Sequence, residues 1–208
     1  MEASKNGLRG RIGNLPVKKF LEARMNDKKI DTDIVWAPWM RIMLHGADCL
    51  VTPSEPVEEF NSDLTELALD MGRTMYAAGG IGLAAPQVGH NVRLIAVDCS
   101  PDQDDIQYLV NPEIVSYDGH TNGDEGCLSF PGLSLTVRRH KNIEVKAQNL
   151  KGEEIRISAG GLLSICIQHE IDHLDGITFI QRVSRQVRRA NMRKWEPMKI
   201  LEVQNGDY

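Results

Sequence analysis

Residues 143–157, IEVKAQNLKGEEIRI, decide the fold class. Apolar and polar side chains alternate over residues 143–148, and this period of two is typical of a strand with one buried face. After a turn around Gly152, the alternation returns at residues 155–157. The stretch therefore predicts an antiparallel β-hairpin.

Shorter strand patterns precede the hairpin, and helical patterns flank the whole β-rich region. The predicted strands cover residues 92–97, 108–110, 114–117 and 133–137, with Asp118-Gly119 as a turn dipeptide. One predicted helix begins at Asn61 or Ser62 and stops at Gly79-Gly80, and another runs from Leu162 to Gly176. Strands joined by short turns between two helices favour an α+β fold with an antiparallel sheet over a doubly wound parallel one.

The composition is that of an ordinary globular protein with one domain. The chain has 208 residues, of which 41% are hydrophobic and 25% charged, and its formal net charge is −5. A chain of this length can bury a core without disulfide or metal staples. We therefore expect any metal ion in this protein to serve catalysis rather than folding. The acidic balance argues against nucleic-acid wrapping by the whole chain.

The sequence shows no pattern for export or for membrane insertion. No run approaches the roughly 20 apolar residues of a membrane helix, and no apolar stretch of a secretory signal follows Met1. We expect a cytoplasmic protein, with an organellar location left open. The four cysteines are widely spaced, which favours free thiols over a disulfide framework. They are Cys49, Cys99, Cys127 and Cys166.

Residues 169–173 form the motif His-Glu-x-x-His within the second predicted helix. The four-residue spacing places both imidazoles on one helix face, where they can hold one metal ion, and Glu170 can reach a metal-bound water. In a chain of this length and composition, only about 0.01 matches to this motif are expected by chance. The alternative, two structural histidines beside an ion-paired glutamate, is disfavoured because buried polar groups without partners are costly.

A catalytic site of this kind usually needs a third protein ligand. No His or Cys follows His173, which excludes the zinc-peptidase arrangement with a downstream His and leaves Glu196 as an acidic candidate. Among the upstream thiols and imidazoles, Cys166 lies on the apolar face of the helix, where a packing role is expected. Cys127 follows Asn122-Gly123, where an irregular backbone can present a thiolate to a site.

Residues 80–89, GIGLAAPQVG, connect the first helix to the first strand. No Lys-Ser/Thr follows the glycines, so this segment is not a phosphate loop. Taken alone, it fits a helix stop followed by a close crossing of two backbones. Gln87 is the exception, since its side-chain amide can donate a hydrogen bond to a developing oxyanion.

Three segments together resemble the signature motifs of the peptide deformylases: residues 80–87, 125–129 and 168–173. They occur in the family's order, and the resemblance covers roughly residues 42–184. It implies an α+β fold in which antiparallel β-sheets pack around a central helix bearing the metal-binding HExxH motif. It also implies a metal-dependent hydrolase that removes the formyl group from N-formylmethionyl nascent polypeptides and releases formate.

The resemblance also implies roles for single residues. The metal ligands would be Cys127, His169 and His173, and the general acid/base would be Glu170. The oxyanion hole would consist of Gln87 and the backbone N–H of Leu128. Ile81 and Gly82 would pair with the substrate backbone. The pocket for the methionine side chain would be lined by Leu162, Ile165 and Cys166.

The donor types alone do not choose the metal, because a thiolate and two imidazoles suit zinc or cobalt as well as ferrous iron. The resemblance favours Fe²⁺, with Zn²⁺, Ni²⁺ or Co²⁺ as substitutes. Two other functions stay open. A zinc endopeptidase would use an acidic or His third ligand, and Cys127 argues against it. A metal-stabilised binding module at the ribosome would have four protein ligands and would keep its function without Glu170.

The chain divides into three parts around this resemblance. We expect residues 1–40 to be an N-terminal extension, residues 41–184 to be the catalytic domain, and residues 185–208 to be a basic C-terminal helix and tail. The apolar residues of the extension lead us to expect that part of it packs on the body.

The C-terminal part concentrates positive charge. Residues 181–199 contain seven basic side chains and a single acidic one, Glu196. Val183, Val187 and Trp195 are available to pack this helix on the body. The basic stripe is either a solvated helix face or a docking surface for ribosomal RNA.

Overall fold

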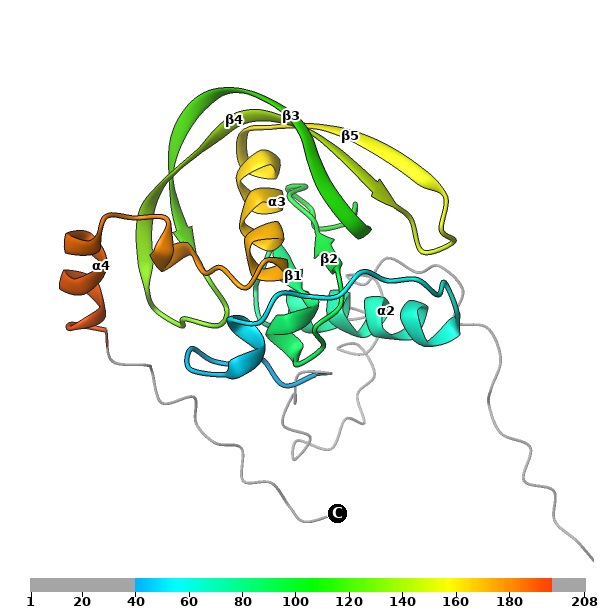
Figure 1. Cartoon of the computed structure of the whole chain (residues 1–208), viewed down its shortest axis with the longest axis horizontal. Helices are drawn as coiled ribbons and strands as arrows, with labels where there is room; N and C mark the ends of the chain where they lie inside the picture. Colours follow the sequence, from blue (N-terminus) through cyan, green and yellow to red (C-terminus); the bar gives the residue numbers. More distant parts are fainter. Residues whose placement is uncertain (1–39, 196–208) are drawn as a thin grey trace, which may run out of the picture. The chain divides into compact units, whose positions relative to one another are not determined.

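A computed structural model describes residues 40–195 of the chain (Figure 1). Five antiparallel strands form one sheet in the order β1-β2-β3-β4-β5. The strands are β1 (Gly82–Ala84), β2 (Leu94–Val97), β3 (Gln107–Gly126), β4 (Ser134–Gln148) and β5 (Glu154–Gly160). The helices are α2 (Ser62–Ala77), α3 (Gly161–Leu174) and α4 (Arg185–Met192), and the 3-10 turns are η1 (Asp48–Leu50), η2 (Ala85–Val88) and η3 (Phe179–Gln181).

The predicted hairpin is present as β4 and β5. Val145 pairs with Ile157, and Ala147 pairs with Ile155. Since side chains of paired residues lie on the same face of the sheet, both pairs are directed to one side. Val145 and Ala147 are fully or almost fully buried there. The prediction of an antiparallel hairpin is confirmed.

Both predicted helices form close to their expected ends. The side-chain oxygen of Asn61 accepts a hydrogen bond of 3.0 Å from the Leu64 N–H and so caps α2. Beyond its last turn, Gly79 has a φ of +70°, a conformation that favours glycine. Helix α3 ends in the same way, because the N–H of Gly176, at φ +70°, bonds to the His173 carbonyl.

The strand lengths differ from the prediction. The segments predicted at 108–110 and 114–117 belong to the single strand β3, and the segment predicted at 133–137 is part of β4. Asp118-Gly119 is not a turn, since pairing with β4 continues on both sides of it. Gly119 does adopt a φ of +60°. Gly119 thus has the backbone conformation that a turn would require. The chain nevertheless does not reverse there, because β3 stays paired with β4.

Helix α3 is the centre of the fold, and strands β3, β4 and β5 curve over it in Figure 1. On one side, Ile167, Ile171 and Leu174 join the apolar cluster that includes β-sheet residues such as Val145. A second cluster forms between α2 and strands β1 and β2. These contacts confirm the predicted α+β class, with antiparallel strands around a central helix.

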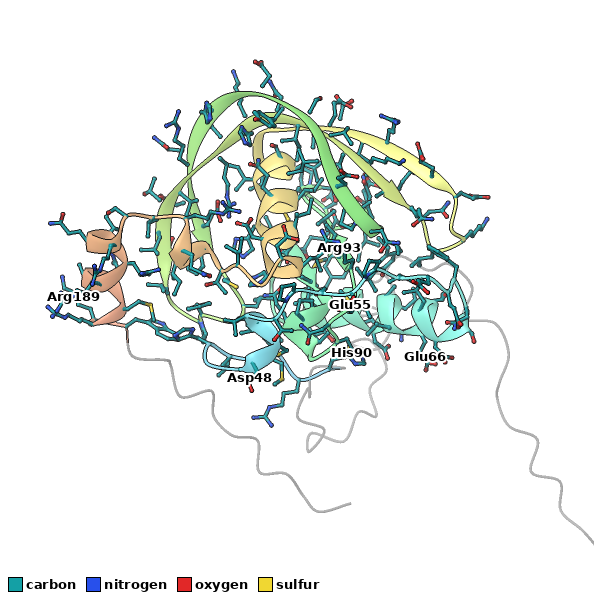
Figure 2. All side chains as sticks on the ribbon, viewed as in Figure 1. Asp48, Glu55, Glu66, His90, Arg93 and Arg189 are labelled. Carbon is teal, nitrogen blue, oxygen red and sulfur yellow. The ribbon has the colours of Figure 1, made fainter. Side chains whose placement is uncertain are left out.

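Helix α4 carries the exposed basic side chains, and Arg189 extends away from the ribbon in Figure 2. Trp195 follows the helix and donates a hydrogen bond of 3.0 Å from its indole nitrogen to the Pro131 carbonyl. Its ring also packs 5.5 Å from that of Phe130. Val183 packs on the same cluster as predicted, but Val187 is 42% exposed because it lies on the solvent side of a helix that has no buried residue.

Two expectations concern segments that the structure describes only in part. The N-terminal extension, residues 1–40, lies outside the described residues except for Met40, and so does the tail beyond Trp195. Within residues 40–195, no helix has the length and apolar character needed to cross a membrane.

Candidate active site

Three potential metal ligands converge where the end of β3 meets α3. Cys127 follows β3 in a turn closed by a hydrogen bond from the Phe130 N–H to the Cys127 carbonyl, 2.9 Å long. His169 and His173 lie one turn apart on α3. The ligand atoms of the three residues all lie within 4.8 Å of one another, and the Cys127 Sγ is 3.3 Å from the His173 Nε2. This arrangement could hold one metal ion.

Asn122-Gly123 does not supply the irregular backbone expected before Cys127. Both residues lie within β3 and pair with Arg138 and Val137 of β4. Strand pairing continues to Gly126, which is opposite Ser134. The chain leaves regular structure only at Cys127 itself, so the thiol stands at a strand end rather than in a long loop.

The orientation of the imidazoles suits metal binding, and His169 would release a proton when a metal binds. The Nδ1 of His169 lies 2.8 Å from Glu125 Oε2, which leaves its Nε2 for the ligand group. Burial and the neighbouring charges of His169 and Arg139 hold the pKa of His173 well below its usual range, so this imidazole is neutral. Burial opposes charge on His169 too, but hydrogen bonds with Cys127 and Glu125 hold its pKa well above the usual range.

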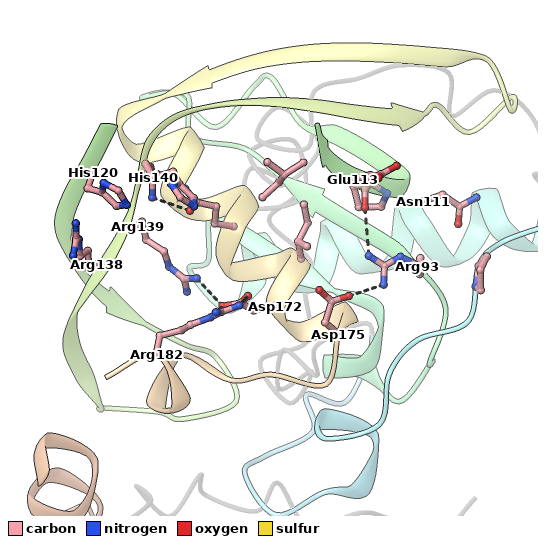
Figure 3. Close-up of a pocket in the computed structure, with 15 residues that line it drawn as sticks. Arg93, Asn111, Glu113, His120, Arg138, Arg139, His140, Asp172, Asp175 and Arg182 are labelled. Carbon is pink, nitrogen blue, oxygen red and sulfur yellow. Dashed lines mark hydrogen bonds and ion pairs between the residues drawn. The ribbon is translucent and has the colours of Figure 1, made fainter. Parts of the chain in front are cut away.

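Glu125 is itself fixed by a chain of buried ion pairs. Arg139 donates two hydrogen bonds to the Glu125 carboxylate, of 2.7 and 2.9 Å, and a third of 2.6 Å to Asp172. Arg182 binds the same Asp172 from the other side, with its Nε 2.8 Å from Oδ2 (Figure 3). A metal ligand on α3 is thus connected through β3 and β4 to the segment that leads to α4.

Sequence reasoning gave these residues no part in supporting the site, and it counted Arg182 only among the basic side chains of residues 181–199. Arg139 and Arg182 belong to no motif, and Asp172 occupies a variable position of His-Glu-x-x-His. The available signal was indirect: polar residues on a buried helix need partners, and Asp172 is such a residue. That requirement predicts that a partner exists, but it does not say which of the distant arginines supplies it.

Glu170 lies beside the metal-binding group in a tightly packed position. It is buried, and burial raises its pKa to about 7. Among the described residues, its Oε2 has no hydrogen-bond partner. A Cβ added to Gly82 would come within 2.4 Å of Glu170 Oε1 and 2.7 Å of Cys166 Sγ. Gly82 is therefore required for this close approach of strand β1 to α3.

Gln87 reaches the same site from η2. Its Oε1 accepts a hydrogen bond of 2.8 Å from the Ala84 N–H, and this contact fixes the direction of the amide. Its Nε2 lies 3.3 Å from Ser129 Oγ and 3.5 Å from Cys127 Sγ. The N–H₂ group of the Gln87 side chain is therefore directed toward the metal-binding group.

A cavity of about 480 Å³ brings the predicted site residues together. Its lining includes all of them except His173, which is completely buried behind it: Ile81, Gly82, Gln87, Cys127, Leu128, Leu162, Ile165, Cys166, His169 and Glu170. This volume lies within the usual range for small-ligand sites. The cavity can thus hold a small ligand beside the candidate metal ligands.

A larger cavity, of about 710 Å³, lies along a different face of α3 (Figure 3). It is lined by Gln168, Ile171 and Asp172 of the helix and by Arg139 and Arg182, which bind Asp172. It contains none of the three candidate metal ligands. The larger cavity therefore borders the supporting ion pairs, whereas the smaller one is lined by the candidate metal ligands Cys127 and His169 and by Glu170.

The donor set fits a divalent metal. A thiol and two imidazoles, of which His173 is neutral and His169 directs its Nε2 to the group, are ligands that suit zinc and related transition metals once deprotonated. Three protein ligands leave one coordination position for water or substrate. Glu170, whose Oε2 is buried and has no partner within residues 40–195, lines the same cavity as Cys127 and His169.

The comparisons with known proteins agree with this geometry. The family model "Polypeptide deformylase" matches residues 39–189. The peptide deformylase of Chromobacterium violaceum is 45% identical over 146 residues, which cover 70% of this chain and 87% of that protein. The peptide deformylase of Thermodesulfovibrio yellowstonii is 43% identical over 162 residues, which cover 77% and 98%.

Solved structures show the same relationship. A peptide deformylase from Legionella pneumophila matches with a TM-score of 0.74 and 40% identity over 80% of this chain and 99% of that chain. A peptide deformylase from Synechococcus elongatus, in complex with actinonin, matches with a TM-score of 0.73 and 38% identity over 77% and 89%. On these matches and on its Cys-His-His site, the chain belongs to the peptide deformylase family, metal-dependent hydrolases that remove the formyl group from nascent polypeptides.

Proposed function

We propose that this chain releases formate from N-formylmethionyl peptides at the 480 Å³ cavity, with Fe²⁺ held by Cys127, His169 and His173. The observation that carries the proposal is that Cys127, His169 and His173 form one potential metal-binding group, and that Cys127, His169 and the buried Glu170 line the same cavity. Bound there, the metal would supply Lewis-acid activation of a water and of the formyl carbonyl.

Glu170 is our candidate for the general acid/base. Its pKa of about 7 lets it both accept and return a proton near neutral pH. The carboxylate would take a proton from the attacking water and give it to the departing amine. Burial has a second effect, since it keeps bulk solvent from competing for that proton.

Gln87 and Leu128 are our candidates for stabilising negative charge on the formyl oxygen. The Gln87 amide is oriented in advance by its bond to the Ala84 N–H, so little reorganisation is needed when charge develops. Leu128 lines the same cavity directly after Cys127, where its backbone N–H would be the second donor. One such donor is typically worth about 3 to 4 kcal/mol.

The open edge of the sheet supports a mode of peptide binding. Strand β1 is an edge strand of the sheet. The Ile81 carbonyl accepts a hydrogen bond of 2.8 Å from the Asp98 N–H, on the side of β1 that faces β2. Because backbone groups of successive residues point to alternate edges, those of Gly82 face the open edge. We assign backbone pairing with an extended peptide chiefly to Gly82, and Ile81 to the cavity wall.

The methionine side chain would occupy the apolar part of the cavity. Leu162, Ile165 and Cys166 of α3 line it, and Leu162 is 55% exposed. A partly exposed leucine at a cavity mouth is available to be covered by a ligand. Burial of one such apolar side chain contributes about 1.5 to 3 kcal/mol to binding.

A direct assay separates this function from its alternatives. Formate release from a formyl-Met tripeptide should occur and should fall when a chelator removes the metal. A zinc endopeptidase would instead cleave internal bonds of unformylated peptides, and a ribosomal binding module would show no turnover. Absence of formate release from the metal-loaded protein would refute the proposal. Reconstitution with Fe²⁺, Zn²⁺, Ni²⁺ and Co²⁺ in parallel would test the choice of iron.

We further propose that the basic surface of α4 docks on ribosomal RNA, and that the protein works in the cytoplasm. The exposed arginines of this helix support the docking proposal. Docking would place the site near formylated chains as they emerge.

A further inference from the structure

Gly123 lies inside β3, although nothing in the strand itself requires a glycine there. It is not among the glycines with a positive φ in the part of the chain that the structure describes. Its pairing with Val137 of β4 is regular. Glycine weakens the interior of a strand, and it often marks a place where another group approaches closely. The reason for this glycine therefore lies outside β3.

The group that approaches Gly123 is the side chain of Ile165 on α3. Val137, opposite Gly123, is completely buried, and Glu125, two residues further along β3, is almost completely buried. Paired residues and residues two apart share one face of a sheet, so position 123 faces the interior. A Cβ added to Gly123 would come within 2.8 Å of Ile165 Cδ1. Such a contact is too short to be tolerated, so the Ile165 side chain would have to move.

The same strand and helix also meet at the metal-binding group. Ile165 and His169 lie four residues apart on one face of α3, and the Nδ1 of His169 is 2.8 Å from Glu125 Oε2. Two residues of a strand span about 6.6 Å and four residues of a helix about 6 Å, so the two contacts are in step. Ile165 thus occupies, beside β3, the space that a side chain at position 123 would fill.

We propose that Gly123 is a positioning residue that determines how long a side chain the 480 Å³ cavity accepts. Gly123 does not line the cavity, but Ile165 does, together with Leu162 and Cys166. Without a side chain at position 123, Ile165 stays against β3 and leaves room for a long, unbranched side chain such as methionine. A larger residue there would drive Ile165 into the cavity. The proposal rests on the proposed function and adds a determinant of its substrate preference.

The expected effect follows from the size of the displacement. Carbon atoms pack best about 3.5 to 4.0 Å apart, so Gly123→Ala would move Ile165 Cδ1 by about 1 Å. One methylene more or less in an apolar pocket changes discrimination by about 10- to 200-fold. The side chain of a formyl-Ala peptide is too short to meet the displaced Ile165. The ratio of kcat/KM for a formyl-Met tripeptide over a formyl-Ala tripeptide should therefore fall about 10-fold or more.

The test uses the full-length, zinc-loaded parent, Gly123→Ala, Ile165→Val and the double variant. Ile165→Val removes Cδ1, the atom that a Cβ at position 123 would meet, so the double variant should recover most of the parent's preference for formyl-Met. Zinc content should be equal in all of these proteins. Asn122→Ala is the matched control, because Asn122 is an exposed neighbour on β3 that does not line the cavity. It should keep the parent's preference.

The inference is overturned if Gly123→Ala keeps the parent's preference, or if it loses turnover of both peptides to the same extent, as a general loss of structure would. It is also overturned if the double variant recovers nothing. A parent that releases no formate refutes the proposed function instead. Crystal structures of the parent and Gly123→Ala would then still decide whether Gly123 keeps the Ile165 side chain out of the cavity.

Discussion

Glu170 combines burial, a pKa of about 7 and an unpartnered oxygen among the described residues, and it packs directly on Gly82. Glutamine has almost the same shape, so Glu170→Gln should preserve the fold and the metal while it removes proton transfer. We expect turnover of a formyl-Met peptide to fall by about 10²- to 10⁴-fold. Glu144→Gln, on an exposed face of β4, is the matched control. Near-normal activity in Glu170→Gln would show that the assigned role is wrong.

Cys127 and Cys166 both line the cavity, but only Cys127 belongs to the metal-binding group. A thiolate binds transition metals far better than a hydroxyl does. Cys127→Ser should therefore lower the metal content of the purified protein. Cys166→Ala should retain the metal and mainly enlarge the pocket, which would raise KM for formyl-Met peptides.

Metal analysis of both variants decides between the two roles. If Cys127→Ser keeps full metal occupancy, the ligand assignment fails. If Cys166→Ala loses its metal, that cysteine has more than a packing role.

At the residue scale, the sequence located the potential ligands but not the side chains that support them. The motif spacing placed His169 and His173 on one face of a helix, because helical geometry is local. Glu125, Arg139 and Asp172 meet only through the folding of β3, β4 and α3, and no local pattern encodes such a meeting. Their contact is a consequence of strand register.

Among the elements, β4 is both a strand of the hairpin and, through Arg139, a support of the metal-binding group. Arg139 lies on β4, is 5% exposed, and pairs with Glu125 on β3 and Asp172 on α3. Removing it by Arg139→Ala would leave a buried carboxylate on β3 without its bidentate partner. Breaking a buried pair in this way typically costs about 3 to 5 kcal/mol. We expect a loss of this order in urea unfolding, together with weaker metal binding.

Arg156→Ala provides the comparison. Arg156 lies on β5 and pairs with Glu154 at 3.6 Å, but both side chains are more than half exposed. Solvent screens such an exposed pair, so this variant should unfold at almost the urea concentration of the parent. Equal stability of the Arg139 and Arg156 variants would contradict a structural role for the buried ion pairs.

At this scale, the sequence predicted the types of the elements better than their lengths. The hairpin and both helices were predictable, since side-chain periodicity and capping residues are local signals. The length of β3 was not, because Asp118-Gly119 is a strong turn dipeptide and yet lies opposite continuous pairing with β4. Pairing along two long strands is a non-local contribution, and it outweighs one local preference.

In the whole molecule, the basic charge of α4 contrasts with the net charge of −5. The helix has no buried residue, and Arg185 and Arg189 are exposed. Trp195, just beyond it, contacts Phe130 in the turn that follows Cys127. Deletion of the chain from Arg185 onward would therefore remove a packing contact near the site as well as the charges. Substitution of the charges alone is the cleaner test of ribosome docking.

Arg185→Gln combined with Arg189→Gln removes two positive charges and leaves Trp195 in place. If these arginines neutralise phosphates, log K for ribosome binding should depend less steeply on log salt. The slope should change by up to about 0.9 for each phosphate no longer neutralised in a duplex, and by less in single strands. Co-sedimentation with ribosomes at low salt should weaken. Turnover of a free formyl-Met peptide should stay within a few-fold of the parent, because neither arginine lines the cavity.

Lys141→Gln combined with Lys151→Gln is the matched control. It changes the net charge equally, but it alters exposed positions at β4 and at the β4–β5 turn instead of α4. A general attraction between the protein and ribosomal RNA would be weakened to the same extent by both double variants, because it depends on net charge alone. A specific dock requires the α4 variant to lose co-sedimentation while the lysine variant retains it. Equal behaviour of the two would refute docking through α4, even if both bind ribosomes less well than the parent.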